Sequence, residues 1–256
     1  DLWDLRVYLA IHALRAGQST VQRLTMRFRW VLFLVLLIIG ALGVSVWRGW
    51  ISLPPQWNPW APLDVKARPN LLTRYKLMRL RDDPQLCDQA LSSSGLRVTR
   101  QVDSPNATCP LINTVRVQGG EIALSSNFLA SCRLAVSFAL FDRHVLQPTA
   151  QAVYGQAITR VDHLGSFACR NVYNRDNGRL SQHASANALD IAGFRLADGR
   201  TVSVLKDWPK DNQDARFLRQ VRDGACEMFS VVLSPDYNAA HHNHFHVDVG
   251  PWWVCR

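Results

Sequence analysis

An uncharged apolar segment constrains this chain more than any other feature of its sequence. The segment runs from Trp30 to Trp47, and Ser45 is its only polar side chain. As a helix it would rise about 27 Å, close to the ~30 Å hydrocarbon core of a bilayer. Trp30, Trp47 and Trp50 stand at its ends, where indole rings prefer the membrane interface. We therefore expect a transmembrane anchor over residues 30–50, in contact with the lipid bilayer.

The charges around this segment predict its orientation. Residues 1–29 hold five Arg and two Asp, whereas Arg48 is the only charge between residues 30 and 63. Because positive residues stay on the cytoplasmic side, we expect residues 1–29 in the cytoplasm and everything after residue 50 outside the inner membrane. A cleaved signal peptide is the alternative, but residues 46–49 lack a small-x-small cleavage site.

The rest of the chain divides into a linker and one domain. Residues 51–63 are rich in Pro and Trp, which is typical of a stiff, extended linker. Residues 64–256 have the length of a single domain. Hydrophobic residues make up 48% of the chain and charged residues 19%, which excludes a disordered chain. The net charge of +9 suits an anionic surface or polymer, and no nucleic-acid motif is present, so we expect no nucleic-acid partner.

Hydrophobic periodicity predicts an α+β fold. We expect short helices at residues 70–80, 84–91 and 214–229. A longer helix is expected to begin near Ser126 and to kink or end at Pro148. Strands are expected at residues 158–164, 188–194, 201–205 and 244–249, with a hairpin turn at Asp198-Gly199. These strands would form a small antiparallel sheet that is flanked by helices and carries the candidate site.

Cysteine usage agrees with an exported domain. All six Cys follow the apolar segment and none has C-x-x-C spacing, which argues against a zinc ribbon or a redox motif. An even number of Cys outside the cytoplasm predicts three disulfides. We expect neighbours along the chain to pair, as Cys87–Cys109, Cys132–Cys169 and Cys226–Cys255.

Two motifs hold five of the eight His residues. The first, residues 181–190, places His183 and Asp190 seven positions apart. On one continuous helix the two would lie about 10 Å apart along the axis, whereas the ligands of one Zn²⁺ each lie about 2 Å from the metal. If both bind one metal, the segment must fold back, with His183 in a loop and Asp190 on a strand.

The second motif, residues 241–248, has the alternation of a strand. His244, His246 and Asp248 would share one face, with Phe245 and Val247 on the core face. One His can then bind a metal while its neighbour faces the substrate, and Asp248 can support an imidazole. Imidazole and carboxylate ligands with an open position suit catalytic zinc. Iron triads use the same ligands, but their short His-x-Asp spacing is not evident, and a histidine–asparagine–histidine nuclease is matched only by the letters of residues 242–244.

Taken together, these motifs resemble the bacterial extensin-like C-terminal domain family. That family lies in a superfamily of D-Ala-D-Ala metallopeptidases, murein endopeptidases and the zinc domain of hedgehog proteins. The resemblance covers roughly residues 54–256 and rests on Ser-x-His-x(6)-Asp followed by His-x-His. Further matching stretches are residues 165–170, 180–190, 232–235 and 244–248.

The resemblance implies a set of functional residues. It implies three zinc ligands, which are His183, Asp190 and His246. His244 would be the catalytic residue beside the metal, and Arg170 would face the substrate. Superfamily members that cut D-Ala-D-Ala dipeptides often carry Glu-x-x-His, with the Glu as base. Asn243 occupies that position here, which favours a mechanism of the His-x-His type.

Location and resemblance together predict a membrane-anchored zinc metallopeptidase that acts on peptidoglycan peptides. It would hydrolyse amide bonds as a DD- or LD-endopeptidase or carboxypeptidase. The alternative is a non-catalytic zinc-containing module that binds cell-wall peptide or a protein partner, as hedgehog proteins keep this fold for binding. The complete set of three ligands and His244 favours catalysis.

Overall fold

The computed structural model describes residues 26–105 and 108–256, and its contacts divide the chain into two units, Asp1–Pro54 and Pro55–Arg256. In the first unit, the described residues form one helix over Met26–Trp47, followed by a turn. This helix has the length and composition of a membrane anchor or of a signal sequence. The expected cytoplasmic segment, residues 1–29, lies outside the described residues except for its last four.

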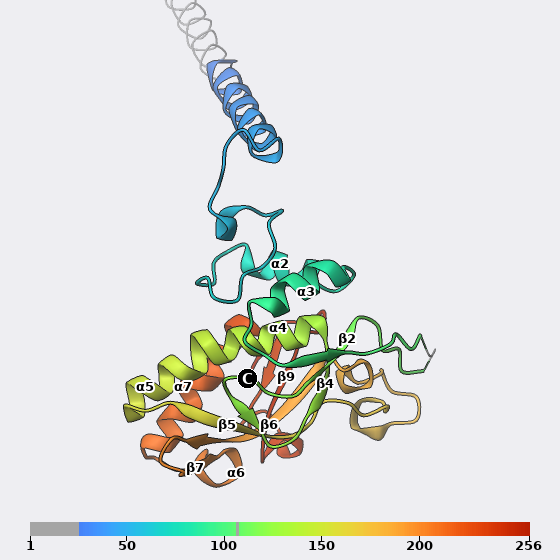
Figure 1. Ribbon diagram of the computed structural model, residues 1–256, viewed down its shortest axis with the longest axis vertical. Coiled ribbons are helices and arrows are strands. Elements are labelled where there is room, and N and C mark those ends of the chain that lie inside the picture. The colour runs from blue at the N-terminus through green and yellow to red at the C-terminus, as the bar shows by residue number, and fades with distance from the viewer. Residues whose placement is uncertain (1–25, 106–107) are drawn as a thin grey trace, which may run out of the picture. The chain divides into compact units, whose positions relative to one another are not determined.

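The second unit is a mixed α+β domain (Figure 1). Its α-helices are α2 (Thr73–Arg79), α3 (Pro84–Ser92), α4 (Cys132–Phe141), α5 (Gln147–Tyr154), α6 (Val204–Asp207) and α7 (Gln213–Met228). Its other helical segments are the 3₁₀ turns η1 (Pro55–Trp57), η3 (Val172–Asn174), η4 (Gln182–Ser185) and η5 (Ala239–His241), and the π-helix η2 (Asp142–Leu146). Its strands are β1 (Val98–Arg100), β2 (Thr114–Val117), β3 (Ala123–Leu124), β4 (Phe128–Ser131), β5 (Ile158–Gly165), β6 (Ala188–Leu196), β7 (Thr201–Ser203), β8 (Val231–Leu233), β9 (Phe245–Asp248) and β10 (Val254–Cys255).

The strands form two sheets. A small antiparallel sheet has the order β1-β2-β4. The larger sheet has the order β10-β8-β9-β6-β5-β3, with β7 also paired to β6. Its central strands β8, β9, β6 and β5 are antiparallel, as expected, whereas β3 and β10 pair in parallel at its edges.

A helical layer covers one face of the larger sheet and forms the core with it (Figure 1). Helices α4 and α5 pack on α7, and α2 and α3 pack on α4. Leu189 and Ile191 of β6 and Phe245 and Val247 of β9 are buried in this core. Because successive residues of a strand point to opposite faces, the residues between them lie on the other face of the sheet.

The long helix expected from Ser126 begins instead at Cys132. The residues before the helix form β4, in which alternate side chains are buried, the period of a strand. Ser131 is the N-cap, because its Oγ accepts the backbone N–H of Leu134. The sequence offers several serines here, and the period-two burial of the strand decides which one caps the helix.

Pro148, expected to kink or end this helix, does not end the helical run. Helix α4 continues through the π-helix η2 into α5, and Pro148 lies in the first turn of α5. A missing N–H is tolerated there because it has no partner within the helix. The run ends at Gly155, whose φ of 68° is the left-handed conformation that glycine adopts easily.

The other expected elements agree with the structure, with two differences at their ends. The strand expected over residues 201–205 stops at Ser203, where α6 begins. The strand expected to be last, β9, is followed by β10. The predicted turn at Asp198-Gly199 joins β6 to β7, and Gly199 has a left-handed φ of 87°.

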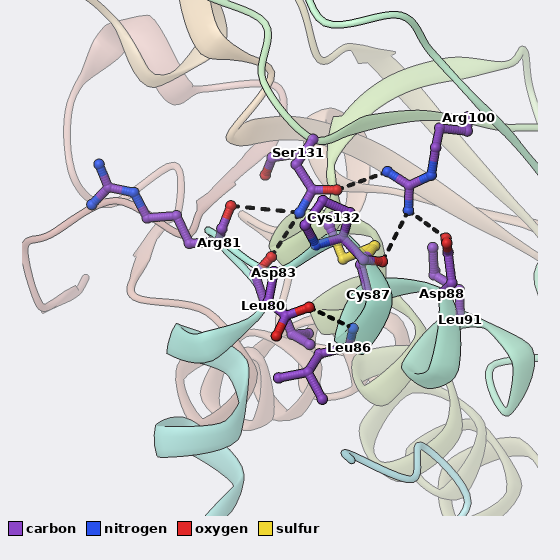
Figure 2. Close-up of a disulfide and its surroundings, with 12 residues drawn as sticks. Leu80, Arg81, Asp83, Leu86, Cys87, Asp88, Leu91, Arg100, Ser131 and Cys132 are labelled. Carbon is purple, nitrogen blue, oxygen red and sulfur yellow. Dashed lines mark hydrogen bonds and ion pairs between the residues drawn. A yellow bond between two sulfur atoms is a disulfide. The ribbon is translucent and has the colours of Figure 1, made fainter.

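Three disulfides close within the domain: Cys87–Cys132, Cys109–Cys169 and Cys226–Cys255. The number and the last pair are confirmed, but the predicted pairs Cys87–Cys109 and Cys132–Cys169 are wrong. The physical reason is the packing of α3 against α4, which brings Cys87 to the start of α4 across 45 residues of chain (Figure 2). Order along the chain does not report this packing.

Candidate metal centre

The turn η4 and strand β6 bring His183 to Asp190. The turn ends at Ala186, whose φ of 53° is left-handed, and the chain then enters β6 at Ala188. As a result, His183 Nε2 lies 3.3 Å from Asp190 Oδ1. The predicted fold-back is confirmed, with His183 outside the strand and Asp190 within it.

Strand β9 supplies the third residue. Asp190 and His246 are direct partners in the antiparallel pairing of β6 with β9. His246 Nδ1 lies 3.0 Å from Asp190 Oδ1 and 3.2 Å from His183 Nε2. Three potential ligand atoms from three segments therefore meet on the face of the sheet that the helices leave uncovered.

Each imidazole is held by an acceptor on its other nitrogen. His183 Nδ1 lies 3.1 Å from the carbonyl oxygen of Ser166, and His246 Nε2 lies 3.1 Å from Asp248 Oδ2. Asp248 in turn accepts the backbone N–H of Gly250 at 2.8 Å. Outer acceptors of this kind orient metal-binding imidazoles and fix the tautomer that presents a lone pair to the metal. The expectation that Asp248 supports an imidazole is confirmed.

The spacing of the three inner atoms fits a tetrahedral zinc ion. With zinc–ligand distances of about 2.0–2.2 Å, neighbouring ligand atoms of a tetrahedron lie about 3.3 Å apart. The observed separations are 3.0, 3.2 and 3.3 Å. Among the described residues, His183, Asp190 and His246 are the group of His, Cys, Asp or Glu side chains close enough to share a metal. Three protein ligands leave the fourth position for water or substrate.

Hydrogen bonding opposes desolvation within this cluster. Burial alone would raise the pKa of Asp190, but hydrogen bonds and charge interactions with His183 and His246 hold that pKa well below its ordinary value. Burial alone would lower the pKa of His246, yet hydrogen bonds to Asp190 and Asp248 raise it to about 9. The environment therefore favours a positive charge between these carboxylates.

His244 lies at the edge of the cluster, just before β9. Its Nε2 lies 3.5 Å from Asp190 Oδ1, and its Nδ1 lies 2.8 Å from Asn243 Oδ1. Burial lowers the pKa of His244, so its imidazole is neutral at neutral pH. The His241 ring lies 5.3 Å from the His244 ring, and burial together with the neighbouring imidazoles lowers the pKa of His241 to about 4.

A cavity of about 910 Å³ opens over the cluster. Arg170 lines it, is exposed, and makes no side-chain hydrogen bond or ion pair within the part of the chain that the structure describes. Arg179 also lines it, with its guanidinium 5.7 Å from the centroid of the Trp252 ring. The two guanidinium groups make the cavity suitable for an anionic or carboxylate-bearing ligand.

Several residues of the site escaped the sequence reasoning. Ser166 acts through its backbone carbonyl, which no side-chain motif can reveal. Tyr173 accepts a hydrogen bond of 2.9 Å from Asn238 Nδ2, which joins two loops at the cavity. Tyr173 and Asn174 both have a left-handed φ of 55°, a costly conformation for residues other than glycine and one found at functional sites. Their nearness to Arg170 in sequence was the one available signal.

A comparison with known protein families supports the resemblance that the sequence motifs indicate. The profile of a family described as extensin-like protein C-terminus matches residues 85–256. This range contains all six Cys and both histidine motifs, and it begins later than the expected start near Pro54. No curated protein and no solved structure matches the chain. Because the matched range is more than half of its length, the chain belongs to the extensin-like protein C-terminus family.

Proposed function

We propose that this chain is a membrane-anchored, zinc-dependent peptidase that hydrolyses amide bonds in peptidoglycan peptides. The observation that carries the proposal is the meeting of His183, Asp190 and His246 beneath an open cavity, with an acceptor fixing each imidazole. Resemblance of the two motifs to those of D-Ala-D-Ala metallopeptidases and murein endopeptidases supports the reaction class.

The residues around the cluster have the chemistry that amide hydrolysis needs. A bound zinc ion would lower the pKa of a water ligand towards ~7 and polarise the scissile carbonyl. Neutral His244 can accept the proton of a nucleophile through Nε2, because its Nδ1–H donates to Asn243 Oδ1. Asn243 therefore positions the base, where related enzymes carry a Glu. Arg170 is free to bind a substrate carboxylate or a developing oxyanion.

The chain's disulfides and charges support action outside the cytoplasmic membrane. Three disulfides persist in an oxidising compartment, and all of them follow the apolar helix. The Arg residues that precede this helix favour a cytoplasmic N-terminus. Peptidoglycan lies in the compartment that this orientation gives to the domain, and its peptides are rich in D-amino-acid amides.

Digestion of purified sacculi tests the proposal. The full-length chain, loaded with zinc, should release peptides with new amino and carboxyl termini that mass spectrometry can identify. His244→Ala should keep its zinc but lose about 10²–10⁴ in rate, the usual cost of removing a general base or a stabilising donor. The matched control is His242→Ala, because His242 is exposed and, among the described residues, its side chain bonds only the Ala239 carbonyl, so this variant should cleave at the wild-type rate.

Three outcomes would contradict parts of the proposal. Wild-type rates for His244→Ala would remove its catalytic role. Loss of zinc from His244→Ala, to the same extent as from His246→Ala, would make His244 a ligand. Zinc-loaded wild-type chain that binds sacculi without cleaving them would identify the non-catalytic zinc module instead.

A further inference from the structure

Helix α2 and the turn before it expose an apolar stripe. Leu71, Tyr75 and Met78 recur at the spacing of one helix side, and they are 92%, 43% and 53% exposed. The other side of the helix carries Leu77 and Leu80, which are buried in the core. A surface helix normally has one apolar and one polar side, so this helix has an apolar side without a partner among the described residues of the domain.

The segment that precedes α2 is fastened along it. Lys76 Nζ donates a hydrogen bond of 2.7 Å to the carbonyl of Pro55, and Arg79 Nη1 donates one of 2.9 Å to the carbonyl of Pro59. Residues 55–60 therefore lie beside the helix in a defined arrangement. Both contacts belong to the second unit, so this arrangement is part of the domain itself.

Three exposed tryptophans extend the stripe on its two sides. Trp57 and Trp60 lie on the fastened segment. Trp253 lies beyond α2, where the Arg74 guanidinium is 4.1 Å from the centroid of its ring. We call the surface formed by these residues the α2 face; its members are Trp57, Trp60, Leu71, Tyr75, Met78 and Trp253.

The α2 face lies in a strongly basic part of the chain. Residues 55–80 hold five Lys or Arg and one Asp, a net charge of +4; Lys66, Arg68 and Arg74 are exposed, whereas Lys76 is buried. Indole and phenol rings prefer the headgroup level of a bilayer, and basic side chains are attracted to anionic lipid. The combination of aromatic, aliphatic and basic side chains therefore matches an anionic lipid surface.

The linker limits the distance between the start of the domain and the end of the apolar helix. The apolar helix ends at Trp47 and the domain begins at Pro55, with residues 48–54 between them. An extended chain of this length spans at most about 25 Å. With the helix in the bilayer, as proposed above, the first residues of the domain cannot move further than this from its end.

We propose that the α2 face docks on the anionic lipid headgroups of the bilayer that anchors the chain. Its tryptophans, Tyr75, Leu71 and Met78 insert at the headgroup level, while Arg74, which contacts Trp253, lies over the phosphates. Docking fixes the orientation of the domain at the membrane in addition to its tether. The inference rests on the anchor in the proposed function, and it is independent of zinc and of catalysis.

Oxidation of Met78 reports docking directly. The full-length chain is placed in nanodiscs, one chain per disc, and methionine oxidation by dilute peroxide is followed by mass spectrometry. Met78 should oxidise several-fold more slowly in discs with anionic lipid than in discs with zwitterionic lipid alone. Co-elution of the chain with the discs in size-exclusion chromatography reports anchoring, and buried Met228 reports folding.

Matched variants separate docking from anchoring. The double variant Leu71→Ser, Tyr75→Ser should restore fast oxidation of Met78 in anionic discs while the chain still co-elutes with the discs. Leu205→Ser, at an apolar position that is 49% exposed on α6 at the opposite end of the domain, should leave Met78 protected (Figure 1).

Each remaining outcome would overturn the inference. Equal Met78 oxidation in both lipids and in all variants, in a chain that still co-elutes with the discs, leaves the anchor intact and removes docking. If the chain does not stay with the discs, both the anchor and the docking are wrong. Protection found only in discs that hold two chains assigns the face to a second copy. None of these results changes zinc content or sacculus cleavage, so they are distinguishable from a failure of the proposed enzyme.

Discussion

Strands β6 and β9 present Leu189, Ile191 and Phe245 to the helical layer on one side and Asp190 and His246 to the cavity on the other. Both faces come from alternate residues of the same short strands, because the side-chain period of a strand is two. The helix-covered face gains transfer free energy, about 1.5–3 kcal/mol for each large buried side chain. The cavity face gathers polar groups that bond one another. Stability and the candidate chemistry can therefore be separated residue by residue along one strand.

The pKa values of two partly buried carboxyl groups, one on the cavity face and one in the helical layer, show the same difference between the two regions. On the cavity face, His183 of turn η4 and His246 of strand β9 outweigh burial and lower the pKa of Asp190. In the helical layer, burial dominates at Asp142 and raises its pKa to about 6, although Gln147 Nε2 donates a hydrogen bond to it at 2.8 Å. A buried carboxylate is thus stabilised as an anion only where cationic or donor groups converge on it.

The largest expected effect comes from removing the charge at the centre of the cavity face. Asp190→Ala takes away the oxygen that faces both His183 and His246, and we expect bound zinc to fall from about one per chain to near zero. Sacculus cleavage should fall below detection. Elemental analysis of the purified chain measures the zinc, with the exposed Asp198→Ala as control. Zinc retained at the wild-type level would remove Asp190 from the ligand set.

A substitution on the helix-covered face of β9 should lower the stability of the domain and leave zinc binding intact. Phe245 is buried between His244 and His246 in sequence, and its ring lies 5.4 Å from that of Trp208. Phe245→Ala should lower the free energy of unfolding by about 3–5 kcal/mol, because it removes a large core side chain and leaves a cavity. Urea denaturation followed by Trp fluorescence measures this loss.

The folded fraction of that variant should still bind zinc, because its ligands lie on the other face. Phe167→Ala, at an exposed ring, is the control and should change the free energy of unfolding by less than about 0.5 kcal/mol. Loss of zinc with unchanged unfolding would show that the two faces are not separable as described.

The two faces also explain what the sequence alone could predict. The alternation of His and apolar residues over 244–249 encodes both faces of β9, and the helical period over 214–229 encodes the buried side of α7. The fold-back between His183 and Asp190 followed from the requirement that both reach one metal. These features are local, so they can be inferred before any tertiary contact is known.

The features that could not be predicted depend on packing between distant segments. The partner of Cys87 is set by the contact of α3 with α4, and the start of α4 is set by the pairing of β4 with β2. The acceptor for His183 is a backbone carbonyl on a separate loop, at Ser166. In the sequence, α2 has the pattern of an ordinary amphipathic helix. Only the burial of its side chains shows which side the rest of the domain covers.

The smallest expected effect concerns Asp142, the carboxyl group that is partly buried in the helical layer. Because folding raises the pKa of Asp142 from about 3.9 to about 6, the folded state binds a proton more tightly than the unfolded state. Its contribution to stability is therefore most favourable below pH 4, declines as pH rises to about 6, and stays unfavourable above that. Asp142→Asn keeps a side-chain oxygen that can accept the hydrogen bond from Gln147, but its amide group cannot ionise.

We therefore expect Asp142→Asn to raise the free energy of unfolding at pH 8 by about 1–2 kcal/mol, after allowance for the solvent that reaches a partly buried group. At pH 4 the variant and the wild type should be nearly equal. Urea denaturation at a series of pH values measures the difference, and the exposed Asp198→Asn should show no such gain. A gain that is the same at every pH would mean that ionisation of Asp142 is not its cause. A lower free energy of unfolding at pH 8 would mean that neighbouring groups stabilise the Asp142 anion in the helical layer, as they stabilise the Asp190 anion on the cavity face.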